Sequence, residues 1–156
     1  MKDIFKLLIS LVICQFAGIL GSIFTRPNIA SWYSSLKKPS LAPPNWVFAP
    51  VWTILFLLMG IALYLVWKQG WQDTKVRKAI LIFFIHLIIN ILWSAVFFGL
   101  HQPLAGFLVI ILLWLFIVIT IIYFANISKL AGFLLIPYLL WVSFASVLNF
   151  MLFKIN

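Results

Sequence analysis

Five runs of apolar residues, separated by short polar breaks, constrain this chain more than any other feature. The runs cover residues 4–24, 46–67, 79–100, 104–124 and 130–153. Each has the roughly 20 residues that a helix needs to cross about 30 Å of hydrocarbon. A backbone in lipid must satisfy its own hydrogen bonds, and these runs lack the alternation of barrel strands. We therefore predict an all-α integral membrane bundle of five transmembrane helices, forming one domain over residues 1–156.

Composition and charge fit a chain whose solvent is lipid. Apolar residues make up 66% of the sequence and charged residues only 8%, whereas a soluble domain carries about 25% charged residues. The 11 Lys and Arg residues lie almost wholly in the breaks, opposed only by Asp3 and Asp73. Side chains in these places contact lipid headgroups, so the bilayer is a predicted partner and nucleic-acid binding is excluded.

The cations also bear on membrane orientation, because an odd number of spans places the two termini on opposite sides. The N-terminal side carries Lys2, Lys6, Lys68, Lys75, Arg77, Lys78 and Lys129, and the other side carries Arg26, Lys37, Lys38 and Lys154. The positive-inside rule favours a cytoplasmic N-terminus. The margin is small and leaves the orientation open.

Several kinds of chemistry are missing from the spans. No Asp or Glu lies within an apolar run, so the spans lack a carboxylate pair for acid–base catalysis or a proton relay. No phosphate-binding glycine loop and no metal-ligand cluster occur, and no metal site is predicted. The single cysteine, Cys14, is expected to be a small buried hydrophobe. Ion-coupled and ATP-driven transport are therefore disfavoured.

Aromatic and neutral polar residues recur at helical spacing in three of the runs. Residues three or four positions apart share one helix face, so each run can present a stripe toward a common interior. The candidate ligand-binding residues are Trp52 and Phe56 in the second run, His86, Asn90, Ser94 and Phe97 in the third, and Tyr138, Trp141 and Ala145 in the fifth. A flat apolar ligand could stack between Trp52 and Trp141 and bond to the Asn90 amide. Three cations, Arg26, Lys37 and Lys38, could meet acidic groups of the ligand at the rim.

The break between the first and second runs is unusually long. Residues 25–45 contain four prolines, and Trp32, Tyr33 and Leu36 have the spacing of one face of a short helix. We expect this helix to lie at the membrane interface and the long first loop to fold over the ligand pocket as a lid.

Structural roles compete with each of these interpretations. Trp52 and Trp141 fit interior packing without a ligand about as well as a binding site. A lone His86 inside a span fits a neutral, hydrogen-bonded core residue better than a ligand contact. Small residues of the first run, Ala17, Gly18, Gly21 and Ser22, permit close helix packing within the bundle or across a homodimer.

Three groups of residues carry a family resemblance. The first contains Trp32-Tyr33, Lys38-Pro39-Ser40, Pro43-Pro44 and Pro50-Val51-Trp52, the second contains Asn90, Trp93 and Phe97-Phe98-Gly99, and the third contains Pro137-Tyr138-Leu139, Trp141, Phe144-Ala145 and Leu148-Asn149. In order, and over most of the chain, they resemble the first loop with the second helix, the third helix and the fifth helix of the TspO/MBR family. This is the family of translocator proteins, or peripheral-type benzodiazepine receptors.

The resemblance implies a five-helix bundle, often homodimeric, that requires no cofactor. It implies that porphyrin-like or haem-like tetrapyrroles and benzodiazepine-type drugs are ligands, and that Trp52, Asn90, Trp141 and Ala145 line the pocket while Tyr33 closes it. A multi-pass protein of a bacterial or archaeal cell membrane is expected. Several positions depart from the family pattern, with His86 where glutamine is usual, Phe56 where tyrosine is usual, Leu41 in place of a loop tryptophan and Ala95 in place of a common proline.

Three functions follow from these expectations. The leading one is a membrane receptor or carrier for a porphyrin-like ligand. The second is an enzyme that degrades porphyrin with light and oxygen, for which Trp52 and Trp141 are the catalytic candidates. The third is a regulatory or scaffold protein that acts through protein partners. The family's C-terminal cholesterol-recognition pattern has Phe150 in place of its tyrosine, so cholesterol binding is not predicted.

Overall fold

The computed structural model describes residues 1–156 and is all-helical. Its elements are α1 (Lys2–Asn28), η1 (Ile29–Tyr33), η2 (Asn45–Val47), α2 (Phe48–Trp67), α3 (Thr74–Ser94), η3 (Ala95–Gly99), α4 (Pro103–Ile127), α5 (Lys129–Leu134) and α6 (Ile136–Ile155). Five continuous helical segments are long and apolar enough to cross a membrane, namely Lys2–Tyr33, Asn45–Trp67, Thr74–Gly99, Pro103–Ile127 and Lys129–Ile155. The predicted five-span, all-α fold is confirmed.

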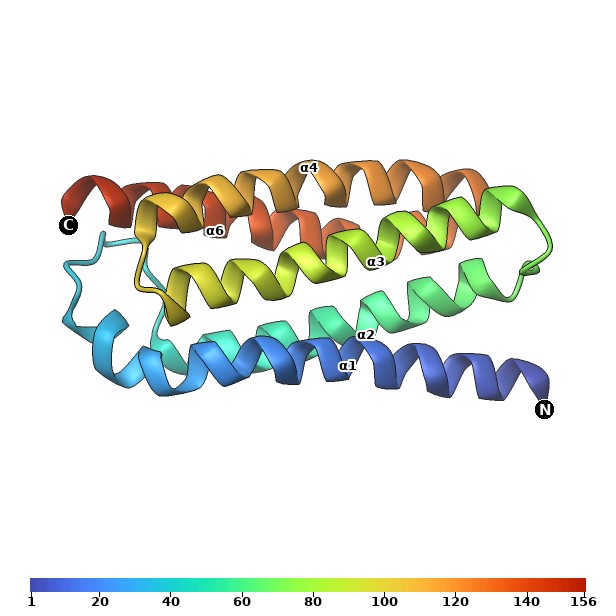
Figure 1. The fold of residues 1–156 in the computed structure, drawn as a ribbon, viewed down its shortest axis with the longest axis horizontal. Coiled ribbons are helices and arrows are strands. Elements are labelled where there is room, and N and C mark those ends of the chain that lie inside the picture. Colours follow the sequence, from blue (N-terminus) through green and yellow to red (C-terminus); the bar gives the residue numbers. More distant parts are fainter.

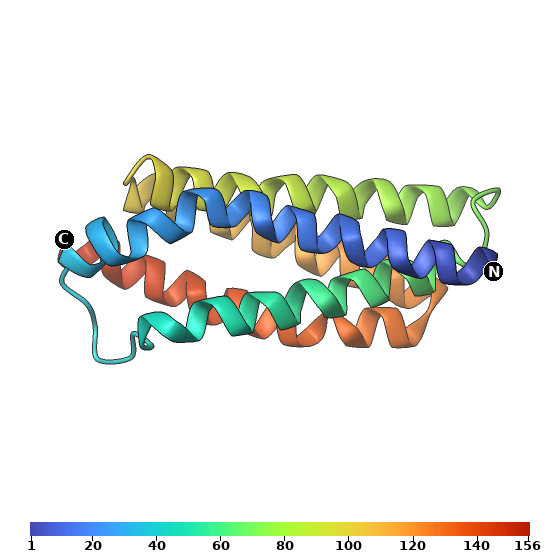
Figure 2. The same cartoon turned by 90° about the horizontal axis from the view of Figure 1, so that it is seen from below.

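The helices run along one axis, with the N-terminus at one end and the C-terminus at the other (Figure 1). α1 packs mainly on α2, α3 mainly on α4, and α4 on α6. The view in Figure 2 shows α1 lying across the side of the bundle between α3 and α2. α1, α2 and α3 therefore meet along one interface, called the three-helix seam below. The candidate site lies in this seam.

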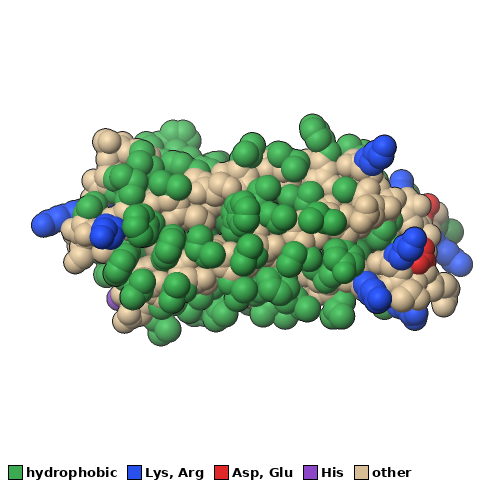
Figure 3. Space-filling model, turned by 90° about the horizontal axis from the view of Figure 1, so that it is seen from above, with side chains coloured by type: hydrophobic (Ala, Val, Ile, Leu, Met, Phe, Trp, Pro, Cys, Tyr) green, Lys and Arg blue, Asp and Glu red, His purple; other side chains and the backbone are tan.

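The outer surface is apolar along the length of the bundle (Figure 3). α1 alone exposes Ile4, Phe5, Leu8, Val12, Phe16, Ile19 and Ile23. A soluble protein rarely exposes an apolar surface of this extent, whereas hydrocarbon accepts it without cost. Lys and Arg side chains gather at the N-terminal end, and the protein is an integral, multi-pass membrane protein.

The first span is longer than the sequence predicted. The expected boundary at residue 24 and the separate interfacial helix are corrected, because α1 runs on through Pro27 to Asn28 and continues as the π-helical turn η1 to Tyr33. Proline lacks an N–H donor and usually interrupts a helix. Here the hydroxyls of Ser31 and Ser34 donate to the carbonyls of Pro27 and Ile29, at 2.8 and 2.6 Å. These bonds support the wider turn, and the loop proper begins only after it.

The fifth span is broken near its start. Pro137 lies at the beginning of α6 and cannot donate to the carbonyl one turn earlier. The chain therefore ends α5 at Leu134 and starts α6 two residues later, with Leu135 between them. The break does not divide the span, because the Leu139 N–H still donates to the Leu135 carbonyl at 3.0 Å.

Candidate functional site

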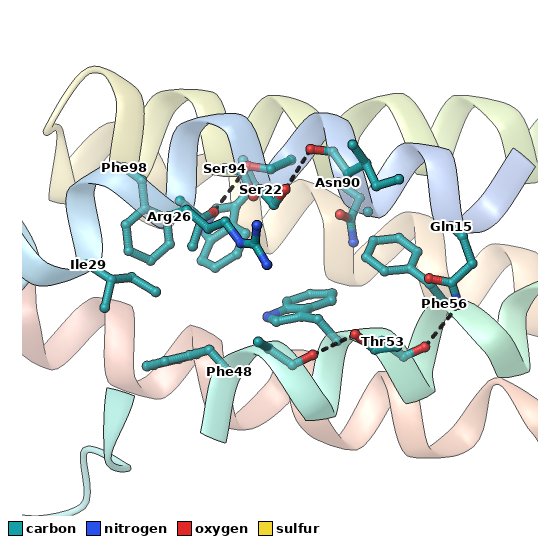
Figure 4. A pocket seen from close by; sticks show the side chains of 17 residues that line it. Gln15, Ser22, Arg26, Ile29, Phe48, Thr53, Phe56, Asn90, Ser94 and Phe98 are labelled. Atoms are coloured by element: carbon teal, nitrogen blue, oxygen red, sulfur yellow. Dashed lines mark hydrogen bonds between the residues drawn. The ribbon is translucent and has the colours of Figure 1, made fainter. Parts of the chain in front are cut away.

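A cavity of about 210 Å³ lies between α1, α2 and α3, toward the C-terminal end of the bundle (Figure 4). Its wall is formed by Gln15, Gly18, Ile19, Gly21, Ser22, Thr25, Arg26 and Ile29 from α1 and η1, by Phe48, Ala49, Trp52, Thr53 and Phe56 from α2, and by Asn90, Trp93, Ser94 and Phe98 from α3 and η3. Ile19 of α1 and Ala49 and Thr53 of α2 are also exposed on the outer surface. The cavity thus has a mouth between α1 and α2, where hydrocarbon lies.

Small residues of α1 leave the space open. Gly21 faces Ser94 across the seam, and a Cβ atom at Gly21 would lie 3.4 Å from the Ser94 hydroxyl oxygen. Gly18 lies against the ring of Phe56, where a Cβ atom would approach to 2.7 Å. The stripe of small residues that could have formed a dimer contact therefore packs within one chain. The homodimer stays a prediction.

Aromatic rings form the opposite wall. The centroid of the Trp52 ring lies 5.7 Å from that of Phe56 and 6.0 Å from that of Trp93, with interplanar angles of 32° and 33°. Ring faces of this kind bind flat apolar molecules by stacking. Trp52 is only half-buried, so part of its indole is available to a ligand.

Polar groups are few and come from three helices. Asn90 of α3 uses its Nδ2 amide to donate to the Tyr138 hydroxyl at 2.6 Å, which leaves the amide oxygen for a ligand in the cavity. Gln15 of α1 donates through Nε2 to the Thr53 carbonyl of α2 at 3.2 Å and joins the two helices at one edge of the mouth. A small number of fixed polar groups in an apolar wall is typical of ligand pockets.

Arg26 is the only charged residue in the cavity wall, and Figure 4 shows its guanidinium group reaching over the open space. The chain has just two acidic side chains, Asp3 at the start of α1 and Asp73 at the start of α3. Both lie at the opposite end of the bundle, so neither can neutralise Arg26. A cation in a partly apolar site favours a ligand that carries an acidic group.

The binding of a ligand between Trp52 and Trp141 stays a prediction. The stripes of the second, third and fifth helices do turn toward one another, and their side chains are in contact. Trp52 contacts Tyr138 at 6.2 Å between ring centroids, and Tyr138 in turn lies 5.5 Å from His86. Tyr138 is fully buried and bonded to Asn90. The open space lies on the α1 side of α2 and α3 instead.

Of the ten candidate ligand-binding residues, the structure brings four together around the cavity, namely Trp52, Phe56, Asn90 and Ser94. His86, Phe97, Tyr138, Trp141 and Ala145 lie in the packed interior or beside it. The His86 Nδ1 atom bonds to the Phe83 carbonyl at 2.6 Å, as expected of a core histidine, while its Nε2 atom is buried without a partner. The Trp141 ring packs on Phe48 and Phe144.

The remaining candidates belong to the end of the first span and to the loop. Tyr33 is buried between Phe48 and Phe98, at 5.8 and 5.9 Å between ring centroids. The Lys38 ammonium lies 5.0 Å from the centre of the Tyr33 ring. Lys37 and Lys38 do not line the cavity, so Arg26 is the only rim cation that reaches it.

Sequence reasoning missed the contribution of α1. Gln15, Gly18, Ser22 and Thr25 are small or polar, and they follow one another at steps of three, four and three. Such a stripe in a helix that otherwise faces lipid indicates a face turned toward protein or a cavity. The signal was present, but small residues fit helix packing equally well.

The fold and the site together define a class of protein, a five-span helical membrane bundle with an aromatic-walled cavity that opens toward lipid. Comparison with known proteins makes the assignment specific. The model of the TspO/MBR family matches residues 10–154, and the chain belongs to that family.

The relatives span most of the chain. The chain is 51% identical to the tryptophan-rich protein TspO of Chlorobaculum tepidum, over 99% of this chain and 98% of that protein. It is 44% identical to the tryptophan-rich protein TspO of Archaeoglobus fulgidus, over 99% of each. It is 35% identical to the translocator protein of Homo sapiens, over 88% of this chain and 82% of that protein.

Proposed function

We propose that this protein is a membrane receptor or carrier that binds an acidic, porphyrin-like tetrapyrrole in the cavity between α1, α2 and α3. The observation that carries the proposal is that Arg26 of α1 and Trp52 of α2 line the same cavity, a lone guanidinium group on one side and an aromatic face on the other. Tetrapyrroles with carboxylate side chains combine a flat apolar ring with anionic groups and match both features. Benzodiazepine-type drugs, which are aromatic and carry no acidic group, would use the aromatic wall alone.

The cavity sets how such a ligand would sit. Its volume of about 210 Å³ is below the roughly 300–1,000 Å³ of pockets that enclose drug-sized ligands. A tetrapyrrole would therefore insert one edge beside Trp52 and leave the rest of the ring between α1 and α2, in contact with hydrocarbon. Entry would occur sideways from the bilayer, through the mouth at Ile19, Ala49 and Thr53.

Each polar group then has a role in binding. Arg26 lies near the end of its span, where a ligand carboxylate can keep contact with the headgroup region. A charge-assisted bond between guanidinium and carboxylate is stronger than a neutral one and fixes the orientation of the ring. The Asn90 amide oxygen can accept a hydrogen bond from a ring N–H. Together these contacts would distinguish a tetrapyrrole from an ordinary acyl chain.

The proposal is tested by titrating purified protein with protoporphyrin and following the quenching of tryptophan fluorescence. We expect saturable binding that Arg26→Gln weakens about tenfold, since a charge-assisted hydrogen bond is lost. The dimethyl ester of protoporphyrin, which lacks the carboxylates, should bind both proteins equally. Lys154→Gln, which removes a cation from the same end of the bundle without touching the cavity, should leave binding unchanged. Quenching that does not saturate would overturn the proposal.

A further inference from the structure

A second hollow lies in the same three-helix seam, toward the N-terminal end. It has a volume of about 470 Å³ and its wall is entirely apolar. The lining residues are Ile13 of α1, Leu63 and Trp67 of α2, Trp71 of the following loop, and Ile80 and Phe84 of α3. Trp71 is half exposed and marks the end of this groove nearest the headgroup region.

Two cations, Lys6 and Arg77, lie on the helices that line the groove, and Arg77 also donates to the Thr74 hydroxyl at 3.5 Å. Lys6 precedes Ile13 by seven residues and so lies on the same face of α1. Its ammonium group lies 5.9 Å from the centre of the Trp67 ring. Arg77 precedes Ile80 by three residues and Phe84 by seven, which places it on the groove side of α3. The apolar groove is thus flanked, at its N-terminal end, by two positively charged residues.

The acidic side chains at this end do not compensate these charges. Asp73 caps α3, where its Oδ1 atom accepts from the Lys75 N–H at 2.8 Å. The other acid is Asp3, against seven cations in the first turns of α1, directly after α2, in the first turns of α3 and at the start of α5. The end as a whole is therefore strongly positive.

We propose that this groove is a binding site for an anionic phospholipid, with an acyl chain along the apolar wall and the phosphate between Lys6 and Arg77. Basic pockets between transmembrane helices bind anionic headgroups because Coulomb attraction adds to the burial of the chain. A zwitterionic lipid offers the same chain but no net negative charge. The groove should therefore select lipids by headgroup, which an ordinary annular contact does not do.

The test uses quenching of tryptophan fluorescence by lipids with brominated acyl chains. Protein in phosphatidylcholine vesicles is titrated with brominated phosphatidylglycerol or with brominated phosphatidylcholine. The difference between the unaltered protein and the double variant Trp67→Phe, Trp71→Phe isolates the two groove indoles from the other six tryptophans. We expect the phosphatidylglycerol signal to saturate at a low mole fraction, and the phosphatidylcholine signal to rise only in proportion to its mole fraction.

The double variant Lys6→Gln, Arg77→Gln should lower the apparent affinity for phosphatidylglycerol about fivefold for each cation removed. Lys75→Gln, Lys129→Gln removes the same charge from the same end but away from the groove, and should have a smaller effect. Ile13→Phe should weaken binding by narrowing the groove, while Leu8→Phe, on the lipid-exposed face of α1 away from the groove, should not.

Two results would overturn the proposal. One is equal, proportional quenching by both lipids, which would indicate annular contact only. The other is saturable binding without preference for phosphatidylglycerol, which would indicate a chain-binding groove that ignores charge. Protoporphyrin binding should be unchanged in all these variants, so this proposal and the proposed function can fail separately.

Discussion

The cavity and the packed interior lie on two sides of the same helices, yet only one of them is open. Trp52 and Asn90 belong to both, because each lines the cavity and each also contacts Tyr138 in the interior. The difference comes from the helix opposite. α6 fills its side with Tyr138 and other large rings, whereas α1 offers Gly18, Gly21 and Ser22. The volume of the side chains on the facing helix therefore decides whether the space beside α2 and α3 is filled or left open as a cavity.

The largest expected effect concerns the place where α1 and α2 touch without a gap. A Cβ atom at Gly60 would lie 2.9 Å from the Leu11 Cα atom, and a backbone cannot move aside easily. Gly60→Ala should therefore lower the free energy of unfolding by about 1–3 kcal/mol. Gly21→Ala, which faces the open part of the seam at 3.4 Å, should change it by less than about 0.5 kcal/mol. Thermal unfolding in detergent measures both, and similar losses would break the contrast between a tight and an open seam.

A smaller effect is expected in the packed interior. Tyr138→Phe removes the hydroxyl that accepts from Asn90 and should cost about 1 kcal/mol of stability. Because Tyr138 lies outside the cavity, protoporphyrin affinity should change less than about threefold. Tyr123→Phe, at a lipid-exposed position of α4, is the matched control for loss of a hydroxyl. If Tyr138→Phe abolished binding at unchanged stability, the interior rather than the cavity would be the site.

The smallest effect is expected in the loop between η1 and η2. The Asn156 side chain accepts from the Lys37 N–H and donates to the Lys37 carbonyl, both at 2.9 Å. Asn156→Ala should speed hydrogen exchange of the loop amides about fivefold with little change in global stability. Asn126→Ala, at the other end of the bundle, serves as the control. Unchanged exchange would show that the loop is held by other contacts.

Much of the fold could be predicted from the sequence because lipid leaves few choices. Apolar length fixed the five spans, and helical spacing correctly placed His86, Asn90, Tyr138 and Ala145 on buried faces. The end of the first span was wrong, since Pro27 was interpreted as a boundary. The hydroxyls of Ser31 and Ser34 make the continued turn possible, and their local bonds have no signature in apolar periodicity.

The position of the cavity could not be predicted in this way. Periodicity shows which side chains face inward, but whether they touch or leave a gap depends on the volumes of residues far apart in the sequence. Trp93 illustrates the difficulty. Its position in the middle of a span is compatible with a lipid-facing, a partner-facing or a buried side chain, but it is buried, and its Nε1–H donates to Asn149 at 3.1 Å. A buried indole bonded to a distant asparagine cannot be identified from its own run.

The central claim is that the ligand binds on the α1 side of α2 and α3. Protoporphyrin affinities of Trp52→Ala and Trp141→Ala, measured side by side by fluorescence quenching, test it most directly. Loss of the cavity indole in Trp52→Ala should weaken binding about tenfold, whereas Trp141→Ala should leave it within about threefold. Strong loss in Trp141→Ala with normal binding in Trp52→Ala would contradict the account and return the site to the interior beside α6.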